Sequence, residues 1–295
     1  MPIEASYAIF RLLLRRSARA LTPVPLLPLL AVGIVAACGT TPATSLPEGP
    51  AGRIVSLDYC ADQFVLGLAD RERILALSPD AGKDFSYLRD EAAGLPTVRP
   101  RSEDVLALEP DLVVRNYGGG PRAAAFFERA GVPVLQIDFA PDIEAVRDRI
   151  RQAAAALGVP ARGEALIGEM DARLARARAA APDADTLYLA PSGVAAGSGT
   201  FVDHLIAAAG LDNFSDEVGW RSIPLERLVY ETPDSYAVPV FENANHMVWT
   251  PFRHPVAVRR VQAGPTLSID GATTSCGAWF LADAVEALAA GAGLL

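Results

Sequence analysis

Short apolar runs alternate with amphipathic stretches along most of the chain, and this alternation predicts its elements. Strands are expected where the apolar runs are short, at residues 54–57, 74–77, 112–114, 134–137, 187–190 and 236–241. Helices are expected between and after them, at residues 62–69, 103–108, 121–130, 143–157, 201–209, 225–230 and 277–290. Strands that alternate with helices favour an α/β fold in which a mostly parallel sheet is covered on both faces.

One stretch in the middle of the chain is longer than the others. Residues 161–180 are rich in Ala, Arg, Glu and Leu and are bracketed by Pro160 and Pro182, which predicts a single long helix. Residues 102–112, before this helix, are echoed after it by residues 225–235, since both contain Glu, a short apolar helix and then Pro-Asp. The echo indicates two related lobes, although chance similarity in an α/β chain would also explain it.

The first 52 residues differ in composition from the rest. Four arginines between residues 11 and 19 precede an apolar run at 21–37, as in a secretory signal. The four residues that end at Cys38 resemble a bacterial lipobox, which implies lipid attachment at Cys38 and a membrane anchor. Two alternatives to lipid attachment stay open. The leader could be cleaved beside an unmodified cysteine, or it could remain as an uncleaved anchor helix. The predicted parts are a signal peptide at 1–37, a flexible tether at 38–52, a first lobe at 53–158, an interlobe helix at 159–182 and a second lobe at 183–295.

Charge and composition narrow the functional classes. The formal net charge is −9, and the chain has one lysine, Lys83, and no basic run, so nucleic-acid binding is not expected. With 51% hydrophobic residues the chain is not disordered, and its three cysteines are too few for a disulfide scaffold. A monomer is expected.

Three features together resemble the substrate-binding proteins of bacterial importers for ferric siderophores and cobalamin. They are the apolar run at 53–57, the segment 103–114 with its Pro-Asp pair, and the single long helix. The resemblance implies two doubly wound α/β lobes joined by one rigid helix, with the ligand in the cleft between them. It also implies a periplasmic, lipid-anchored protein that performs no catalysis and delivers a metal chelate to an ABC permease and its ATPase.

The ligand class stays open between several chelates. The resemblance implies a ferric siderophore or a cobalamin-type corrinoid, with haem or a thiolate-bound metal complex as alternatives, and no resident cofactor. The arginines of the expected cleft loops favour an anionic chelate, although each could equally be a surface or salt-bridge residue: Arg99, Arg101, Arg115, Arg221 and Arg253. A free-metal site is not expected, because no histidines are paired at metal-ligand spacing. A secreted α/β hydrolase is the least favoured class, since no nucleophile-elbow or zinc motif is present.

Ligands of doubly wound sheets lie beyond the carboxyl ends of the strands, so the loops after each strand are the candidate cleft. Planar or apolar chelates need flat apolar walls with a few polar groups. The candidate contacts in these loops, apart from two cysteines, are Tyr59, Tyr87, Arg101, Tyr117, Trp220, Phe241 and Trp279. Each aromatic residue could instead serve packing alone.

Cys60 and Cys276 lie in strand-to-helix loops, one in each predicted lobe. We expect them to face one another across the cleft and to take part in ligand capture, because a thiolate near a helix N-terminus is a good donor to a soft metal. Two alternatives remain open. The cysteines could simply pack, or they could form a disulfide, which needs Cα atoms within about 7 Å and would latch the lobes together.

Each copy of the echoed segment carries a glutamate at the same place. The resemblance implies that Glu103 and Glu226 dock on arginines of the permease, one from each lobe. The alternative is that each is a first-turn residue favoured by its helix dipole.

Overall fold

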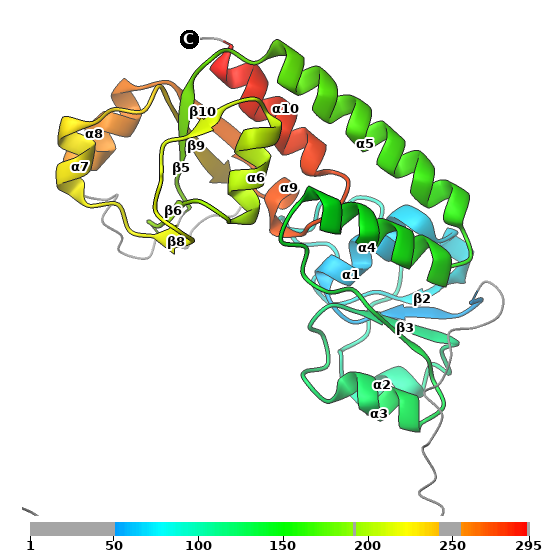
Figure 1. Cartoon of the computed structure of the whole chain (residues 1–295). Helices are drawn as coiled ribbons and strands as arrows, with labels where there is room; N and C mark the ends of the chain where they lie inside the picture. The colour runs from blue at the N-terminus through cyan, green and yellow to red at the C-terminus, as the bar shows by residue number, and fades with distance from the viewer. Residues whose placement is uncertain (1–50, 191–192, 242–254, 294–295) are drawn as a thin grey trace, which may run out of the picture. The chain divides into compact units, whose positions relative to one another are not determined.

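Two four-stranded parallel sheets organise the chain (Figure 1). This computed structural model describes residues 51–190, 193–241 and 255–293. The first sheet has the order β2-β1-β3-β4 and consists of β1 (Ile54–Ser56), β2 (Ile74–Ala76), β3 (Leu112–Arg115) and β4 (Val134–Gln136). The second has the order β10-β9-β5-β7 and consists of β5 (Asp185–Tyr188), β7 (Asp212–Asn213), β9 (Ser235–Val240) and β10 (Thr266–Asp270). A short antiparallel ribbon pairs β6 (Ala195–Ala196) with β8 (Trp220–Arg221).

The two sheets have the same topology. In each, the first strand along the chain lies between the second and the third, and the fourth pairs with the third. The echoed segments take matching positions, because one runs into β3 and the other into β9. The predicted α/β class with two doubly wound lobes is therefore confirmed.

The helices up to α7 begin and end close to the predicted positions. In the first lobe they are α1 (Tyr59–Leu68), the 3-10 turn η1 (Arg71–Arg73), α2 (Ser102–Leu106), α3 (Ala123–Arg129) and α4 (Ile143–Ala156). The long helix is α5 (Pro160–Ala180), and those after it are α6 (Phe201–Ala208), α7 (Leu225–Tyr230), α8 (Pro255–Ala263), α9 (Ala272–Ser275) and α10 (Leu281–Ala292). None of these helices, in the residues described, has the length and apolarity to cross a bilayer.

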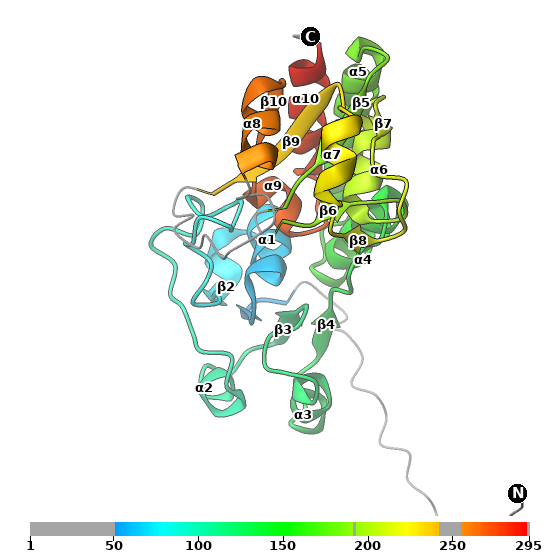
Figure 2. The same ribbon diagram turned by 90° about the vertical axis from the view of Figure 1, so that its left-hand side faces the viewer.

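Helices cover both faces of the first sheet, as its buried strands require. Ile54 and Leu112 point into a core shared with α1 and α4, whereas Val55 and Val113 point into a second cluster with α2 and α3. Figure 2 shows α2 and α3 on the side of the sheet away from α1. All four residues of β3 are buried, which explains why this strand reads as an unbroken apolar run ending in arginine.

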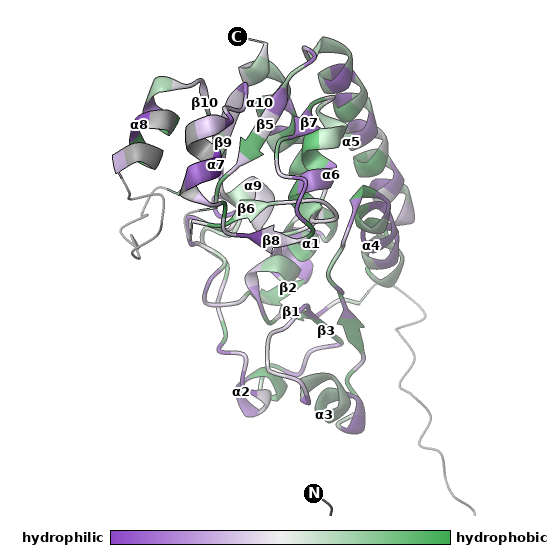
Figure 3. Cartoon of the chain, turned by 60° about the vertical axis from the view of Figure 1, so that its left-hand side comes forward, coloured by the Kyte–Doolittle hydropathy of each residue, from purple (hydrophilic) through white to green (hydrophobic). Residues whose placement is uncertain are grey.

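The long helix α5 buries one stripe of residues at alternating spacings of four and three: Gly163, Ile167, Met170, Leu174 and Ala177. This spacing is that of a single helical face. The stripe packs α5 against α4 and α10, while its other positions mix charged residues with alanines (Figure 3). Gly163 permits the close approach, because a Cβ there would lie 2.5 Å from the Cβ of Ala154 on α4.

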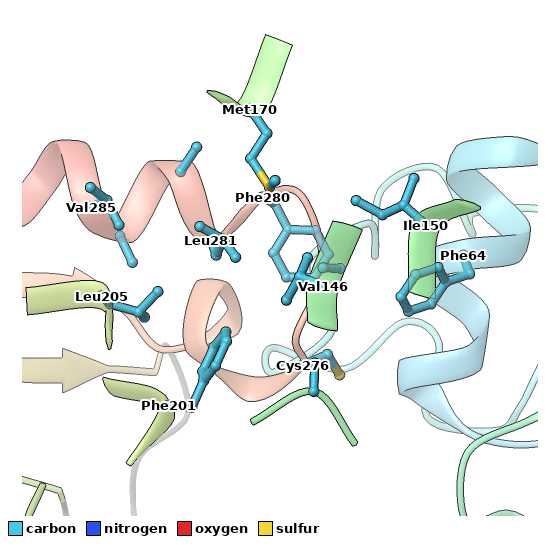
Figure 4. Packing of buried hydrophobic residues seen from close by; sticks show 14 of the residues in the cluster. Phe64, Val146, Ile150, Met170, Phe201, Leu205, Cys276, Phe280, Leu281 and Val285 are labelled. Atoms are coloured by element: carbon cyan, nitrogen blue, oxygen red, sulfur yellow. The ribbon is translucent and has the colours of Figure 1, made fainter. Parts of the chain in front are cut away.

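One hydrophobic core extends through both lobes. Figure 4 shows Phe64 from α1, Met170 from α5 and Phe280 beside α10 packed together. The described residues accordingly belong to one compact unit, which covers 42–295. The lobes are thus joined by shared packing as well as by α5.

The C-terminal segment differs from the prediction. A single helix was expected at 277–290, but the structure has α9, then an extended residue at Cys276, and α10 only from Leu281. Cys276 has extended backbone angles, φ −136° and ψ 142°, which interrupt the helix. The residue is extended because its side chain is bonded to Cys60 of α1. Strand β10, helix α8 and the β6–β8 ribbon were not predicted. The predicted leader and the candidate lipidation site Cys38 lie outside the described residues.

Candidate functional site

A buried aspartate joins the loops that follow β1 and β3. Asp58 caps α1 by accepting a hydrogen bond from the backbone N–H of Ala61 at 3.0 Å. Its Oδ2 atom also accepts the backbone N–H groups of Asn116 (2.7 Å), Tyr117 (3.1 Å) and Gly118 (2.8 Å). A carboxylate with four backbone donors holds its loops firmly, so Asp58 fixes the position from which Tyr117 projects.

A buried glutamine fixes the loop after β2 in the same way. Gln63 on α1 donates to Ser86 Oγ at 2.9 Å, and its Oε1 atom accepts the backbone N–H of Leu88 at 2.8 Å. Phe85, carried by this loop, packs edge-on against Tyr59 with ring centroids 4.8 Å apart. The loops after β1 and β2 are therefore locked together.

Aromatic side chains cluster where these loops meet. The ring of Tyr59 lies 6.2 Å from that of Tyr117, and Tyr117 is 53% exposed. Phe139, in the loop after β4, is 70% exposed. Exposed aromatic rings cost free energy in water, so a cluster of them at a cavity is typical of a ligand wall.

A cavity of about 230 Å³ lies against this cluster, and both lobes line it. The first lobe contributes Tyr59, Cys60, Phe64, Asn116, Tyr117, Ile137, Asp138, Phe139 and Ala140. The segment after α5 contributes Phe201, Thr274, Ser275, Cys276 and Gly277. We call this space the aromatic cavity. It lies beyond the carboxyl ends of β1, β3 and β4, which is where doubly wound sheets present ligands.

A second cavity of about 240 Å³ is lined mostly by charged residues among those described. It is lined by Asp84 and Arg89 from the first lobe and by Val240 and Asp270 from the second. Val240 and Asp270 are register partners at the carboxyl ends of β9 and β10. We call this space the polar cavity. Its Asp84 immediately precedes Phe85, which contacts Tyr59 of the aromatic cavity.

Cys60 and Cys276 meet, as expected, but as a disulfide. Their Cα atoms are 5.5 Å apart, and both residues line the aromatic cavity. The thiolate interpretation is therefore wrong, because bonded sulfurs have no thiolate to offer a metal. From the sequence, a disulfide was also expected to prevent the lobes from separating and so obstruct the cleft. The structure does not show this difficulty. Cys276 belongs to the shared core and Cys60 packs against it, so the bridge lies where the lobes are already joined.

Two other candidates, Tyr87 and Trp279, contribute to packing between the lobes. Tyr87 stacks on Phe280 at 4.2 Å and its hydroxyl donates to Asp283 of α10. The ring of Trp279 lies 6.0 Å from Phe64. Neither residue lines the aromatic or the polar cavity. Ligand contact by these two residues stays a prediction.

The remaining candidates lie apart from the aromatic cavity. Trp220 on β8 is 45% exposed and packs edge-on against Tyr188, with ring centroids 6.0 Å apart. The ring of Phe241 packs directly on Gly271, where a Cβ on residue 271 would clash with the ring. Both residues neighbour Val240 and Asp270 of the polar cavity in the sequence. Arg101 is an exposed residue just before α2.

Two arginines that were expected to contact a ligand instead form bonds within the protein. The buried Arg115 donates to the carbonyl oxygens of Gly118 (2.8 Å) and Gly120 (3.0 Å). Arg99 pairs with Asp104 at 2.9 Å. Of the residues lining the aromatic cavity none is Lys, Arg or His, so the anionic chelate favoured by the sequence loses its support in this part of the described structure.

The candidate docking residues are both on the surface. Glu103 lies in the first turn of α2 and Glu226 in the first turn of α7, and both are exposed. Neither forms an ion pair with any described residue. This placement fits a docking role and the helix-dipole alternative equally.

Burial and carboxylates shape the electrostatics of the aromatic cavity. The pKa of Tyr59 and of Tyr117 is raised, first by burial and then by the negative charge of Asp58. Behind them burial raises the pKa of Asp62 to about 6, although Ser78 donates to it. Both phenols therefore keep their protons at neutral pH. The described residues contain no group of three or more His, Cys, Asp or Glu side chains that could hold a metal ion.

Sequence reasoning missed several residues of the site. Asp58 had a recognisable signal, because an aspartate directly before an apolar helical stretch is a typical N-cap. Asp138 and Phe139 follow β4, and the rule that selects loops after strands would have included them. Phe201 and Thr274 had no comparable signal, since only the packing of the two lobes brings them to the cavity.

Comparison with known proteins agrees with this architecture. A cobalamin-binding protein of Halobacterium salinarum is 28% identical over 197 residues, which is 62% of this chain and 52% of that protein. The chain thus spans about half the length of the curated relatives it matches.

Solved structures resemble it along almost their entire length. The periplasmic heme-binding protein RhuT from Roseiflexus sp. RS-1 is 26% identical with a TM-score of 0.63, over 82% of this chain and 99% of that one. The periplasmic heme-binding protein BhuT, solved with two hemes, is 26% identical with a TM-score of 0.64, over 83% and 98%. The vitamin B12 binding protein BtuF of Vibrio cholerae has the same fold at 20% identity, with a TM-score of 0.59 over 83% and 98%.

A family model for periplasmic binding proteins matches residues 54–238, which contain the first sheet, the long helix and most of the second sheet. Its members and the neighbours named above are binding proteins rather than enzymes. The chain therefore belongs to the periplasmic binding protein family.

Proposed function

We propose that this protein captures a cobalamin-type corrinoid in the cleft between its lobes and delivers it to an ABC permease. The observation that carries the proposal is the aromatic cavity. Exposed rings line it, while no cationic side chain and no metal-ligand cluster does so among the described residues. Such a site suits a bulky chelate whose metal is already coordinated and whose periphery is uncharged.

Both lobes line each of the two cavities, so a ligand in either one would contact both lobes. Ligand sites commonly have volumes of about 300–1,000 Å³, and each cavity alone is smaller than that. Tyr59 lines the aromatic cavity and packs on Phe85, which follows Asp84 of the polar cavity in the sequence. A corrinoid would extend over both, with its ring against the exposed faces of Tyr117 and Phe139. The curated relative, named as a cobalamin-binding protein, supports the same ligand class.

Haem is the second candidate, because two structures named as heme-binding proteins are 26% identical to this chain. Tyr117 is the exposed phenol that could reach a ferric iron. A phenolate ligand requires loss of the phenolic proton, and the pKa of Tyr117 is raised by burial and by Asp58. Binding of iron through Tyr117 would therefore cost more free energy than binding through a phenol of ordinary pKa.

Delivery would use the surface and the leader expected from the sequence. The exposed Glu103 and Glu226 would meet permease arginines, and lipid on Cys38 would hold the protein at the membrane. The shared core and the Cys60–Cys276 bridge favour a cleft with little relative motion of the lobes. Capture would therefore use a largely preformed site.

A titration against three chelates tests the proposal. Cyanocobalamin, ferric haem and a ferric tris-catecholate are each added to the purified protein, and binding is followed calorimetrically. We expect saturable one-to-one binding of cyanocobalamin, weakened about tenfold in Tyr117→Ala through loss of aromatic contact. Tyr230→Ala is the matched control, because Tyr230 is 86% exposed and lines neither cavity. Tight haem binding without cobalamin binding would contradict the proposal in favour of the second candidate.

A further inference from the structure

The described residues that line the two cavities carry an excess of negative charge. Asp138 is the one charged side chain among the described residues that line the aromatic cavity. The described residues that line the polar cavity include two carboxylates, Asp84 and Asp270, and one guanidinium, Arg89. Among the described lining residues of both cavities there are thus three carboxylates and one cation.

More carboxylates lie just behind the aromatic wall. Asp58 and Asp80 both act electrostatically on the phenols of Tyr59 and Tyr117. The nearby cation Arg115, which is buried and donates to backbone carbonyls, offsets only one of these two negative charges. A ligand in the aromatic cavity thus meets a negative potential from its rim and from its wall.

We infer that Asp84, Asp138 and Asp270 select chelates by the charge of their periphery, admitting amide-bearing corrins and rejecting carboxylate-bearing ones. This inference rests on the proposed function. A ligand carboxylate would be brought next to like charges and lose hydration at the same time, which is unfavourable. A primary amide carries no charge and can donate to the same carboxylates through its N–H groups. Rejection of the wrong ligand by like charge is a common source of specificity.

The positions of the three aspartates suit this role. Asp138 and Asp270 are exposed, so a ligand can reach them without movement of other parts of the protein. Asp270 Oδ1 accepts the backbone N–H of Ala272 at 3.0 Å, which fixes one side of its carboxylate. Asp84 lies in the loop held by Gln63, so its backbone is fixed as well. Because their loops are fixed, these aspartates can discriminate between amide-bearing and carboxylate-bearing corrins without a conformational change.

A matched pair of corrins tests the inference. Dicyanocobinamide and dicyanocobyrinic acid have the same ring, metal and axial ligands, but the first carries amides where the second carries carboxylates. Calorimetric titrations use the full protein, the Asp84→Asn/Asp138→Asn/Asp270→Asn variant, and Glu169→Gln as a control. Glu169 is an exposed residue of α5, which lines neither cavity. A circular dichroism melt establishes that the triple variant is folded.

We expect the wild type to bind the amide corrin at least about tenfold more tightly than the carboxylate corrin. This ratio should fall several-fold in the triple variant and in high salt, and stay unchanged in Glu169→Gln. Equal binding of the two corrins by the wild type would overturn the inference and leave the proposed function intact. A ratio that neither the triple variant nor salt alters would also overturn it. If neither corrin binds, the proposed function is wrong and the inference falls with it.

Discussion

Removing the Cys60–Cys276 bridge should lower the stability of the whole body without unfolding it. The cysteines are separated by 216 residues, so the bridge closes a very long loop in the unfolded chain. Restriction of so long a loop corresponds to about 5 kcal/mol at most in the chain-entropy model. The other members of the shared core, including Phe64 and Phe280, keep their side chains when the bridge is lost, so the fold itself should persist.

The test compares the double variant Cys60→Ala/Cys276→Ala with oxidised and reduced wild type. For a body of this size, a loss of about 5 kcal/mol corresponds to a fall in melting temperature of about 10–20 °C. Thermal unfolding is followed by circular dichroism, and peptide mapping without reduction establishes whether the two cysteines are linked. The reduced wild type and the double variant should melt together, because both lack the same cross-link.

Two results would refute this reasoning. The first is a wild-type peptide map in which Cys60 and Cys276 are separate and alkylated. The second is a bridged protein whose melting temperature does not change on reduction. In the latter case the lobes would be held by the core alone, and the bridge would have no thermodynamic role.

Three further predictions concern other parts of the chain. Because the folded pKa of Asp62 is raised to about 6, its contribution to stability is fully present below pH about 4 and is lost as the pH rises through 6. Asp62→Asn should therefore be more stable than wild type by about 1–3 kcal/mol at pH 8 and show little difference at pH 4, as urea unfolding at both pH values would show. Charge reversal at Glu103 and Glu226 should abolish uptake in cells while leaving ligand affinity intact, and normal uptake would reject the docking role. Cys38→Ser should leave the membrane fraction or remain unprocessed, whereas an unmodified wild-type terminus in intact-mass spectrometry would end the lipid-anchor prediction.

The regular part of the fold was predictable because its signals are local. Strands β1 and β3 are buried on both faces, so each begins with consecutive apolar residues. The long helix is bracketed by prolines and starts at Pro160, as the sequence indicates. Helix α1 starts earlier than predicted, at Tyr59, because Asp58 caps it.

The end of the chain was not predictable from local pattern. The break at Cys276 depends on a partner in α1, which is distant in sequence. Strand β10 is exposed at alternate positions and stays an edge strand, so it lacks the continuous apolar run of a central strand.

The candidate site was predictable where it depends on single loops. Tyr59 and Tyr117 follow strands of the first sheet, and the structure brings them to one cavity. Tyr87 and Trp279 also follow the selection rule, yet their rings pack at the junction between lobes. The rule selects loops near the cleft, and only the packing of the second lobe determines which side chains remain open to a ligand.

The absorption spectrum of the protein purified from its native host tests the central claim most directly. A corrin and a haem absorb in different bands, so the spectrum identifies the chelate without a choice of ligand by the experimenter. Our account predicts corrin bands that disappear when the ligand is removed by denaturation and return when cobalamin is added to the refolded protein. A Soret band in place of corrin bands would contradict the account.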